Sequence, residues 1–260
     1  MNELKLTIIQ TDIIWEDRQK NLQNYESLLD NHKERSDLIV LPEMFTTGFT
    51  MNTADLAEEM NGNAVKWMRT YSAKLNTAMI GSVIIKENGH FYNRLIVVKP
   101  DSEEIEYYDK RHLFRMGNEH RNYSEGSRKL IFDIKGWKIC PLICYDLRFP
   151  VWSRNIGDYD VLIYVANWPE SRREGWNTLL SARAIENQCY VAGVNRIGND
   201  GNMISYSGDS MVIDAKGQII SETKPYSLSA ETVKLSMTDL TDFRQKFPVF
   251  LDKDDFEIKT

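Results

Sequence analysis

Short apolar runs alternate along the chain with stretches whose apolar residues recur every three or four positions. The apolar runs predict strands at residues 4–10, 37–41, 78–86, 91–99, 105–108, 130–134, 137–143, 160–166, 190–195, 209–213, 218–220 and 231–235. The helical spacing predicts helices at residues 17–32, 63–75, 151–156, 173–188 and 238–247. Because hairpins and helical crossovers both occur, we expect an α/β fold with sheets inside and helices outside.

Two local signals refine these boundaries. Residues 87–90 read Glu-Asn-Gly-His, and an Asn-Gly pair between two apolar runs predicts a hairpin. Thr238 or Asp239 is expected to cap the last helix, since either side chain can accept a hydrogen bond from a free N–H at a helix start. No segment rich in Pro, Gly and Ser divides the chain, so residues 1–260 are predicted to form a single domain, with an exposed acidic tail from about residue 251.

The composition is that of an ordinary globular protein, with 42% hydrophobic and 27% charged residues among 260. A net charge of −6 without a basic cluster argues against binding to nucleic acid or to an anionic membrane. The chain has no run of ~18 apolar residues that could span a bilayer, and its first residues lack the features of a signal peptide. Together with an odd number of cysteines, three, these features predict a cytoplasmic protein in a reducing compartment.

Three reactive side chains stand where predicted strands end. Cys144 follows the apolar run at 137–143, and Glu43 and Lys110 each come shortly after another such run. Open α/β folds place their chemistry at strand ends of this kind. A cysteine, a glutamate and a lysine are the three groups that an amide-hydrolysing thiol enzyme needs, so their positions suggest this chemistry.

Each of these side chains has a chemical role to offer. Cysteine supplies the nucleophile, but an unperturbed pKa of about 8.5 leaves it mostly protonated near neutral pH. A cation such as Lys110 favours the thiolate, and Lys110 together with the backbone N–H of Tyr145 offers a site for the oxyanion. Glu43 offers a base that takes the thiol proton, delivers it to departing ammonia and then activates water.

The same residues also have ordinary structural explanations. A cysteine at a strand end is often part of the core, a glutamate after Leu-Pro is often a solvated loop residue, and a lysine beside Arg111 is often a surface charge. Cys140 and Cys189 stand among apolar residues and are predicted to be buried and inert. Cys140 and Cys144 would lie about 13 Å apart on an extended strand, which is too far for a disulfide. Distance along the chain does not show whether the three reactive side chains meet.

Three segments resemble the signature motifs of the nitrilase superfamily of carbon–nitrogen hydrolases, and they occur in the same order. They are Leu-Pro-Glu-Met-Phe at 41–45, Tyr-Asp-Lys-Arg-His-Leu-Phe at 108–114 and Ile-Cys-Tyr-Asp-Leu-Arg-Phe-Pro at 143–150. The similarity extends from Gln10 to the predicted strand at 231–235. It implies a four-layer α-β-β-α sandwich that needs no metal and no organic cofactor.

The resemblance also implies roles for individual residues. Glu43 is expected to be the general base, Lys110 the cation that stabilises the oxyanion, and Cys144 the nucleophile. Glu119, which follows Met-Gly-Asn, resembles a second glutamate that members of the superfamily carry in this region. We therefore expect Glu119 to support catalysis by orienting Lys110 or the substrate.

Segments 145–154, 164–169 and 182–188 are most similar to the omega-amidase group of this superfamily. Such enzymes hydrolyse the terminal amide of 2-oxoglutaramate or 2-oxosuccinamate to the dicarboxylate and ammonia. Bacterial members act in methionine salvage beside a glutamine-dependent transaminase, so we expect a small-molecule amide substrate and metabolic coupling to such a transaminase. The resemblance also implies a homodimer, with the predicted helix at 176–188 and the region of Trp152 near the subunit contact.

An omega-amidase substrate carries a carboxylate at the end remote from the amide, and the fork of an arginine suits a carboxylate. Arg172, which closely follows Trp168, is our hypothesis for this anchor, and Arg173 is the competing residue. Phe45, Tyr145 and Trp168 are expected to form walls of the pocket, although each of these aromatic side chains also fits a place in the core.

Other interpretations of the chemistry stay open. His112 allows a Cys–His dyad of the papain type, although the Cys-Gly-Ser-Cys-Trp surroundings of such enzymes are absent. Within the nitrilase superfamily, the substrate could instead be deaminated glutathione, an N-carbamoyl amino acid or an aliphatic amide. A non-catalytic scaffold of the same fold is a further alternative, against which the presence of Glu43, Lys110 and Cys144 argues.

Overall fold

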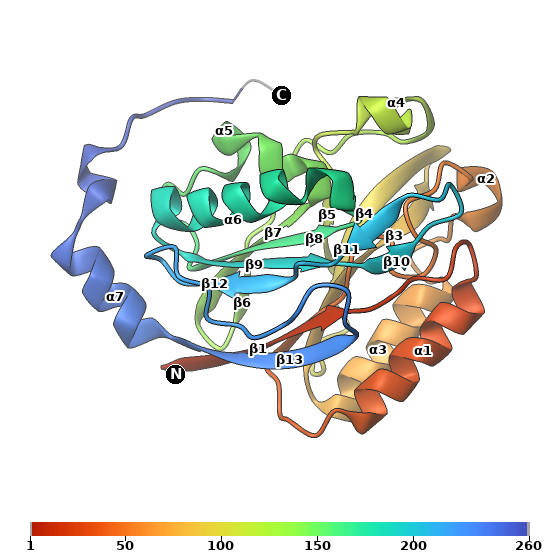
Figure 1. Ribbon diagram of the computed structural model, residues 1–260, viewed down its shortest axis with the longest axis horizontal. Helices are drawn as coiled ribbons and strands as arrows, with labels where there is room; N and C mark the ends of the chain where they lie inside the picture. Colours follow the sequence, from red (N-terminus) through yellow and green to blue (C-terminus); the bar gives the residue numbers. More distant parts are fainter. Residues whose placement is uncertain (1, 259–260) are drawn as a thin grey trace.

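The computed structural model describes residues 2–258, and two β-sheets form the centre of this span (Figure 1). The larger sheet consists, in spatial order, of β13 (Ser229–Ser236), β1 (Glu3–Gln10), β2 (Leu38–Val40), β3 (Ala78–Glu87), β4 (His90–Val98) and β5 (Glu106–Asp109). The smaller sheet consists of β12 (Met211–Ile213), β9 (Tyr190–Asn195), β8 (Val161–Ala166), β7 (Trp137–Ile143) and β6 (Phe132–Ile134). A separate hairpin pairs β10 (Ile197–Asn199) with β11 (Ser205–Ser207).

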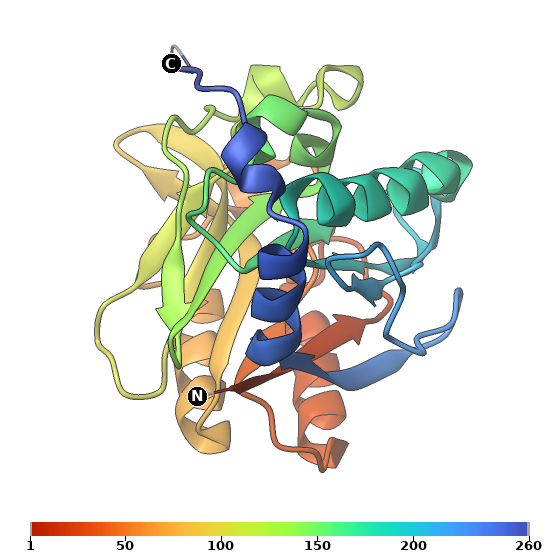
Figure 2. The same ribbon diagram turned by 90° about the vertical axis from the view of Figure 1, so that its left-hand side faces the viewer.

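Helices cover the outer face of each sheet. The longer ones on these faces are α1 (Arg18–Asn31), α3 (Asn63–Leu75) and α6 (Arg173–Asn187). The helix α7 (Met237–Lys246) follows β13 and lies at the side of the sandwich, where it packs against the core between the sheets (Figure 2). Single turns of helix form α2 (Thr53–Leu56), α4 (Glu119–Asn122), α5 (Pro150–Ser153), η1 (Arg115–Gly117), η2 (Cys144–Arg148), η3 (Glu170–Arg172) and η4 (Val249–Asp252). Figures 1 and 2 show α1 and α3 on the larger sheet and α6 on the smaller one, which confirms the predicted four-layer sandwich. Within residues 2–258 we find no helix with the length and apolar character needed to cross a membrane.

The alternation of side chains along buried strands produces these layers. Leu38 and Val40 of β2 belong to the core between the two sheets, whereas Ile39 packs with residues of α1 and α3. Trp176 of α6 is completely buried on the smaller sheet. Burying one such large apolar side chain contributes roughly 1.5–3 kcal/mol, so the two cores together fix the stacking of the layers.

The strand directions bring several loops to one edge of the sandwich. β2 and β3 are parallel, and β5 runs in the same direction because two antiparallel pairings separate it from β3. In the second sheet β7, β8 and β9 are parallel. Glu43, Lys110 and Cys144 follow the carboxyl ends of β2, β5 and β7, so the topology gathers these three loops at the same edge.

The hairpin predicted at residues 87–90 is confirmed. Glu87 pairs with His90 across a two-residue turn between β3 and β4. Asn88 and Gly89 in this turn have φ angles of 51° and 80°. A turn with two left-handed residues matches the twist of the flanking strands, and Asn-Gly is the pair that adopts it most readily.

Two predicted elements differ from the structure. Residues 218–220 form no strand, because β12 is a three-residue edge strand and offers only an isolated bridge between Ile213 and Ile219. The helix expected at 151–156 is the single turn α5. It ends there because the side chain of Asn155 accepts hydrogen bonds from the next backbone N–H groups and forms a turn in place of a helix.

The cap of the last helix also differs. Ser236, rather than Thr238 or Asp239, is the residue that caps α7, and its side chain accepts a hydrogen bond from the Asp239 N–H. Asp239 lies in the first turn, where a carboxylate is favoured by the helix dipole. The sequence correctly predicted a polar side chain that caps this helix, but the cap lies at Ser236, two residues before Thr238.

Candidate active site

Glu43, Lys110 and Cys144 come together beside one cavity. Lys110 Nζ lies 2.8 Å from Glu43 Oε1, and both side chains are at most 1% exposed. The Cys144 Sγ lies 3.9 Å from the backbone oxygen of Asn167, and the Glu43 carboxylate is close enough to raise the pKa of the Cys144 thiol. Lys110 and Cys144 both line the cavity. The structure thus answers the question that the sequence left open, since the three reactive side chains do meet.

Buried amide groups hold the Glu43 carboxylate in place. Its Oε1 accepts a hydrogen bond from Asn93 Nδ2 at 2.8 Å, and its Oε2 accepts one from the backbone N–H of Asn167 at 2.8 Å. The Asn167 side chain donates in turn to the backbone oxygen of Glu43. With Lys110 as a third donor, the carboxylate is well satisfied in the core and its orientation is fixed.

Glu119 lies where the sequence predicted, in contact with Lys110. Its Oε1 is 3.0 Å from Lys110 Nζ, and its Oε2 accepts a hydrogen bond from the backbone N–H of Phe114 at 2.6 Å. Asn93 also reaches Glu119 Oε1, at 3.3 Å. The ammonium group is therefore held between two carboxylates that are themselves fixed by further donors.

These contacts determine the charge state of the cluster. Burial alone would lower the pKa of Lys110, but the carboxylates of Glu119 and Glu43 outweigh it and raise that pKa above its ordinary value. The lysine is consequently a permanent cation near neutral pH. Burial also raises the pKa of Glu119, an effect that Lys110 opposes and Glu43 reinforces.

The cysteine has an unusual backbone and a protonated thiol. Cys144 begins η2 directly after β7 and has a φ angle of 45°, in the left-handed region that a side chain other than glycine's disfavours. Burial raises the pKa of its thiol well above the ordinary value, and the Glu43 carboxylate adds to this effect. Lys110 lowers the pKa, as expected, but does not prevail. The thiol of Cys144 is therefore protonated at rest, and a base must remove the proton during attack.

Asp146 joins the Cys144 turn to the loop that follows Lys110. Its Oδ2 accepts a hydrogen bond from the Ile143 N–H at 3.0 Å, and its Oδ1 accepts one from the His112 N–H at 3.0 Å. His112 Nδ1 lies 2.8 Å from the same Oδ1. The imidazole is therefore paired with Asp146, and His112 is not among the residues that line the cavity. This arrangement does not favour a Cys–His dyad.

The cavity has a volume of about 470 Å³, and several aromatic side chains stand in its wall beside charged and polar ones. Tyr145, Trp168 and Arg172 line it, as the sequence predicted. Phe49 and Phe114 also line it, and neither was predicted. This volume lies within the ~300–1,000 Å³ of typical small-molecule sites, so the cavity suits a small substrate.

Phe45 does not line the cavity, and its predicted role is wrong. Its ring is completely buried under α1 and α3, with centroids 5.5 Å from Tyr25 and 5.9 Å from Trp67. Met44, the preceding residue, has a φ angle of 44°, and this left-handed turn redirects the chain. Phe49 is the phenylalanine at the site, with its ring centroid 5.1 Å from Lys110 Nζ.

The two arginines proposed as anchors have different environments. Arg172 lines the cavity with its Cζ 5.5 Å from the Phe114 ring, and no carboxylate within residues 2–258 pairs with it. Arg173 is already bound to Asp209 at 2.6 Å and does not line the cavity. A guanidinium that is free and faces the cavity can bind a substrate, so the structure favours Arg172.

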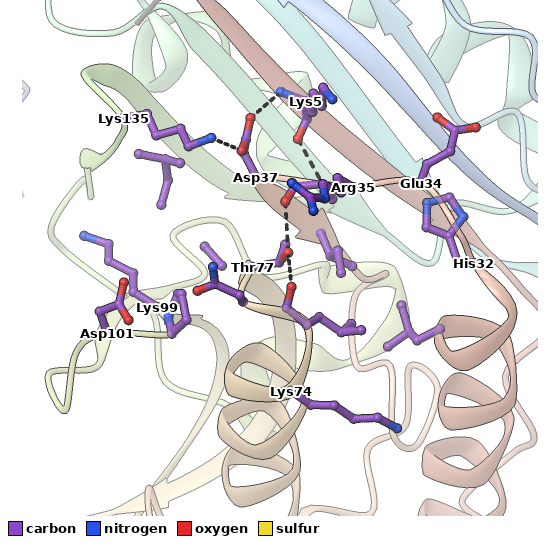
Figure 3. Close-up of a pocket in the computed structure, with 18 of the residues that line it drawn as sticks. Lys5, His32, Glu34, Arg35, Asp37, Lys74, Thr77, Lys99, Asp101 and Lys135 are labelled. Carbon is purple, nitrogen blue, oxygen red and sulfur yellow. Dashed lines mark hydrogen bonds and ion pairs between the residues drawn. The ribbon is translucent and has the colours of Figure 1, made fainter.

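A larger cavity of about 1190 Å³ lies at the opposite end of the strands, where β2 and β3 begin (Figure 3). Figure 3 shows Asp37 in contact with Lys135 and with the backbone N–H of Lys5. Lys74, also on its wall, is paired with Asp30 at 2.6 Å. None of the three reactive side chains lines this space, so the chemistry belongs to the smaller cavity.

The remaining cysteines are buried core residues, as predicted. Cys140 and Cys189 are unpaired and completely buried. Burial raises the pKa of Cys140 to about 12 and also raises the pKa of Cys189. Over residues 2–258, no group of three or more His, Cys, Asp and Glu side chains is arranged to hold a metal ion.

The chain belongs to the carbon–nitrogen hydrolase family, whose profile matches residues 5–245. The family predicted from the three motifs is thereby confirmed. The chain is 45% identical to the omega-amidase YafV of Escherichia coli, over 99% of this chain and 100% of that protein. It is 33% identical to the 2-oxoglutaramate amidase of Bacillus subtilis, over 95% and 96% of the two chains. A crystal structure of a superfamily member from Xanthomonas campestris, with an arsenic adduct in its active site, is 44% identical and matches all of both chains with a TM-score of 0.96.

Proposed function

We propose that this protein is an omega-amidase, which hydrolyses the terminal amide of 2-oxo dicarboxylic acid monoamides such as 2-oxoglutaramate and 2-oxosuccinamate. The products are the 2-oxo dicarboxylate and ammonia. The observation that carries the proposal is the contact of Lys110 with Glu43 beside Cys144, in a cavity whose wall holds the free guanidinium of Arg172. The cluster suits amide cleavage and the arginine suits a carboxylate. The names of the Escherichia coli and Bacillus subtilis relatives support the same substrate class.

In this proposal Glu43, Lys110 and Cys144 act as a catalytic triad. Glu43 removes the thiol proton of Cys144 while Sγ attacks the amide carbon, because burial keeps the resting thiol protonated. The carbonyl oxygen gains negative charge and accepts hydrogen bonds from Lys110 and from the backbone N–H of Tyr145. That N–H belongs to the first turn of η2, where N–H groups have no partner within the helix.

The tetrahedral intermediate then loses ammonia. The C–N bond breaks, Glu43 donates its proton to the leaving nitrogen, and the acyl group remains on Cys144 as a thioester. Glu43 next takes a proton from water, which attacks the thioester, and this proton returns to the sulfur as the acid is released. Glu119 exchanges no proton in these steps, and it positions Lys110 for both oxyanions.

The remote end of the substrate lies against the walls of the cavity. Arg172 binds the carboxylate with its planar fork of donors, and the rings of Trp168 and Tyr145 pack against the carbon chain. These contacts orient the amide toward Cys144, so that binding at one end serves the reaction at the other.

We further propose that the enzyme acts in the cytoplasm as a homodimer, supplied with its 2-oxo amide by a glutamine-dependent transaminase. Val151 on α5 and Ile185 on α6 are 57% and 55% exposed, on the elements expected near the subunit contact. Exposed apolar side chains of this kind are common where subunits meet. Sedimentation at micromolar concentration that shows only monomers would contradict the dimer.

The first test measures ammonia release from 2-oxoglutaramate, with the wild-type enzyme and Cys144→Ala in parallel and glutamine as a control amide. Rapid turnover that the substitution abolishes, with glutamine nearly inert, is the expected result. No turnover by the wild type would overturn the substrate assignment and direct attention to carbamoyl and peptide-like amides.

A further inference from the structure

A second arginine besides Arg172 reaches the cavity without a partner. Arg148 lines the same wall, with its Cζ 4.8 Å from the Trp168 ring. Within residues 2–258 its guanidinium makes no ion pair and no hydrogen bond to a carboxylate. The aromatic ring holds the planar cation by its face and leaves its N–H groups free to bind a ligand.

This guanidinium lies beside the start of α6. A Cβ atom on Gly175 would make ordinary van der Waals contacts there, 3.4 Å from Arg148 Nη2 and 3.7 Å from the Trp168 ring. Gly175 lies in the first turn of α6, where the N–H dipoles disfavour a cation. The helix dipole therefore does not stabilise Arg148, whereas an anion between the arginine and the helix end would be attracted by both.

The acidic residue of the cavity does not neutralise the arginines. Asp200 Oδ1 accepts hydrogen bonds from the N–H groups of Asn202 and Ile204, and its Oδ2 accepts one from the Tyr206 hydroxyl at 2.9 Å. The carboxylate is thus engaged within its own loop. Apart from the buried cluster around Lys110, the free charges that face the cavity are those of Arg148 and Arg172.

We propose that Arg148 is a second specificity-determining residue, which acts with Arg172 to bind the 2-oxo acid end of the substrate and to exclude 2-amino acids. This inference rests on the proposed omega-amidase function. A 2-oxo acid presents only acceptors, the carboxylate and the carbonyl oxygen, to two forks of donors. Glutamine presents an ammonium group in place of that carbonyl, and two guanidinium groups repel it. Arg148 and Arg172 together therefore discriminate between a 2-oxo group and a 2-amino group, in addition to binding the carboxylate.

The test compares Arg148→Ala, Arg148→Lys and the matched control Arg128→Ala, which removes an exposed arginine outside the cavity. KM and kcat are measured for 2-oxoglutaramate and for glutamine. Losing hydrogen bonds to a charged group is expected to raise KM for 2-oxoglutaramate about 10- to 100-fold in Arg148→Ala, with kcat nearly unchanged. The preference over glutamine should shrink, Arg148→Lys should recover part of it, and Arg128→Ala should match the wild type.

Alkylation of Cys144 by iodoacetamide shows whether each variant keeps an intact nucleophile, since this reagent is uncharged and does not need the arginine. If the wild type turns over 2-oxoglutaramate and Arg148→Ala keeps its KM and its preference over glutamine, the role of Arg148 is overturned and the omega-amidase function stands. A fall in kcat at constant KM would also overturn it. No turnover by the wild type would overturn the function and this inference together.

Discussion

Lys110 Nζ lies 3.0 Å from Glu119 Oε1, and neither side chain is more than 1% exposed. An ion pair on the surface contributes about 0–1 kcal/mol, but a buried one behaves differently. Removing either partner of a buried pair leaves the other charge without compensation in a medium of low dielectric constant. Lys110 and Glu119 therefore contribute to the stability of the protein as well as to the proposed reaction. Substitutions of the two residues can test these contributions separately.

Glu119→Gln is expected to lower kcat about 10- to 100-fold with a smaller change in KM. The new amide keeps an oxygen for Lys110, but its NH₂ group faces the Phe114 N–H that now donates to Glu119 Oε2. Losing one hydrogen bond to a charged group corresponds to about 1.5–3 kcal/mol, and the misplaced cation weakens the oxyanion contact. Steady-state kinetics check this, with the exposed Glu125→Gln as control. Unchanged kcat would show that Glu119 does not position Lys110.

Lys110→Met is expected to destabilise the fold by about 3–5 kcal/mol, because two buried carboxylates lose their cation. Without the lysine the pKa of Glu119, which is already raised, rises further. A carboxyl group with a raised folded-state pKa costs stability as pH rises through that pKa, so the deficit should be larger at pH 8 than at pH 5. Urea unfolding at both pH values measures it.

The control for this comparison is Lys99→Met. Lys99 pairs with Glu106 at 2.6 Å on the surface, with both side chains more than a quarter exposed. Its loss should cost less than about 1 kcal/mol at either pH. Equal losses in the two variants would contradict the view that the Lys110 cluster is electrostatically buried.

Alkylation of Cys144 by iodoacetamide is expected to accelerate steadily as pH rises beyond 9. The raised pKa means that the thiol stays protonated below that value, so the reactive thiolate fraction keeps growing with pH. Cys140 and Cys189 should stay unlabelled in the folded protein, since both are completely buried. Mass spectrometry resolves the three sites. A rate that levels off below pH 8 would reveal a preformed thiolate instead.

Arg172→Ala and Arg173→Ala should separate binding from stability. Removing Arg172 is expected to raise KM for 2-oxoglutaramate about 10- to 100-fold, because the substrate carboxylate loses its charged donors. Removing Arg173 should leave KM unchanged and lower the melting temperature, because Asp209 loses its partner. The opposite pattern would transfer the anchor to Arg173.

His112→Asn should retain a substantial fraction of the wild-type rate. The asparagine amide can replace the ring N–H as a donor to Asp146, and His112 touches no part of the cavity. Measuring kcat beside Cys144→Ala decides the matter. Losses of comparable size in the two variants would favour the Cys–His dyad.

Most of the fold could be predicted because its buried strands consist mainly of apolar residues. β7 reads Trp-Lys-Ile-Cys-Pro-Leu-Ile, and all its residues except Lys138 are buried. The single-turn helices α2 and α4 were missed, since four residues are too few to show a helical period. The edge residues 218–220 were misassigned because apolar character alone does not show whether a neighbouring strand is long enough to pair.

The residues of the candidate site that lie in the three motifs, Glu43, Lys110 and Cys144, could be predicted from the sequence, whereas most of the others could not. Asn93 gave a signal that went unused, because an asparagine inside the apolar strand β4 must find buried partners, and these are Glu43 and Glu119. Phe45 and Phe49 could not be told apart, since the left-handed backbone at Met44 leaves no mark in the pattern of apolar residues.

The carboxylate of Asp146 holds the Cys144 turn and the loop that follows Lys110 in a fixed position relative to each other. Grafting the Cys144 turn onto another scaffold would therefore also require Asp146 and the backbone of His112. The hydrogen bonds between them fix the relative position of the two loops. The smallest unit of this active site that can be transferred to another protein is accordingly the pair of hydrogen-bonded loops, and not the three side chains alone. To accept new amides, the enzyme can be redesigned at Arg148 and Arg172 while the hydrogen bonds of Asp146 are kept.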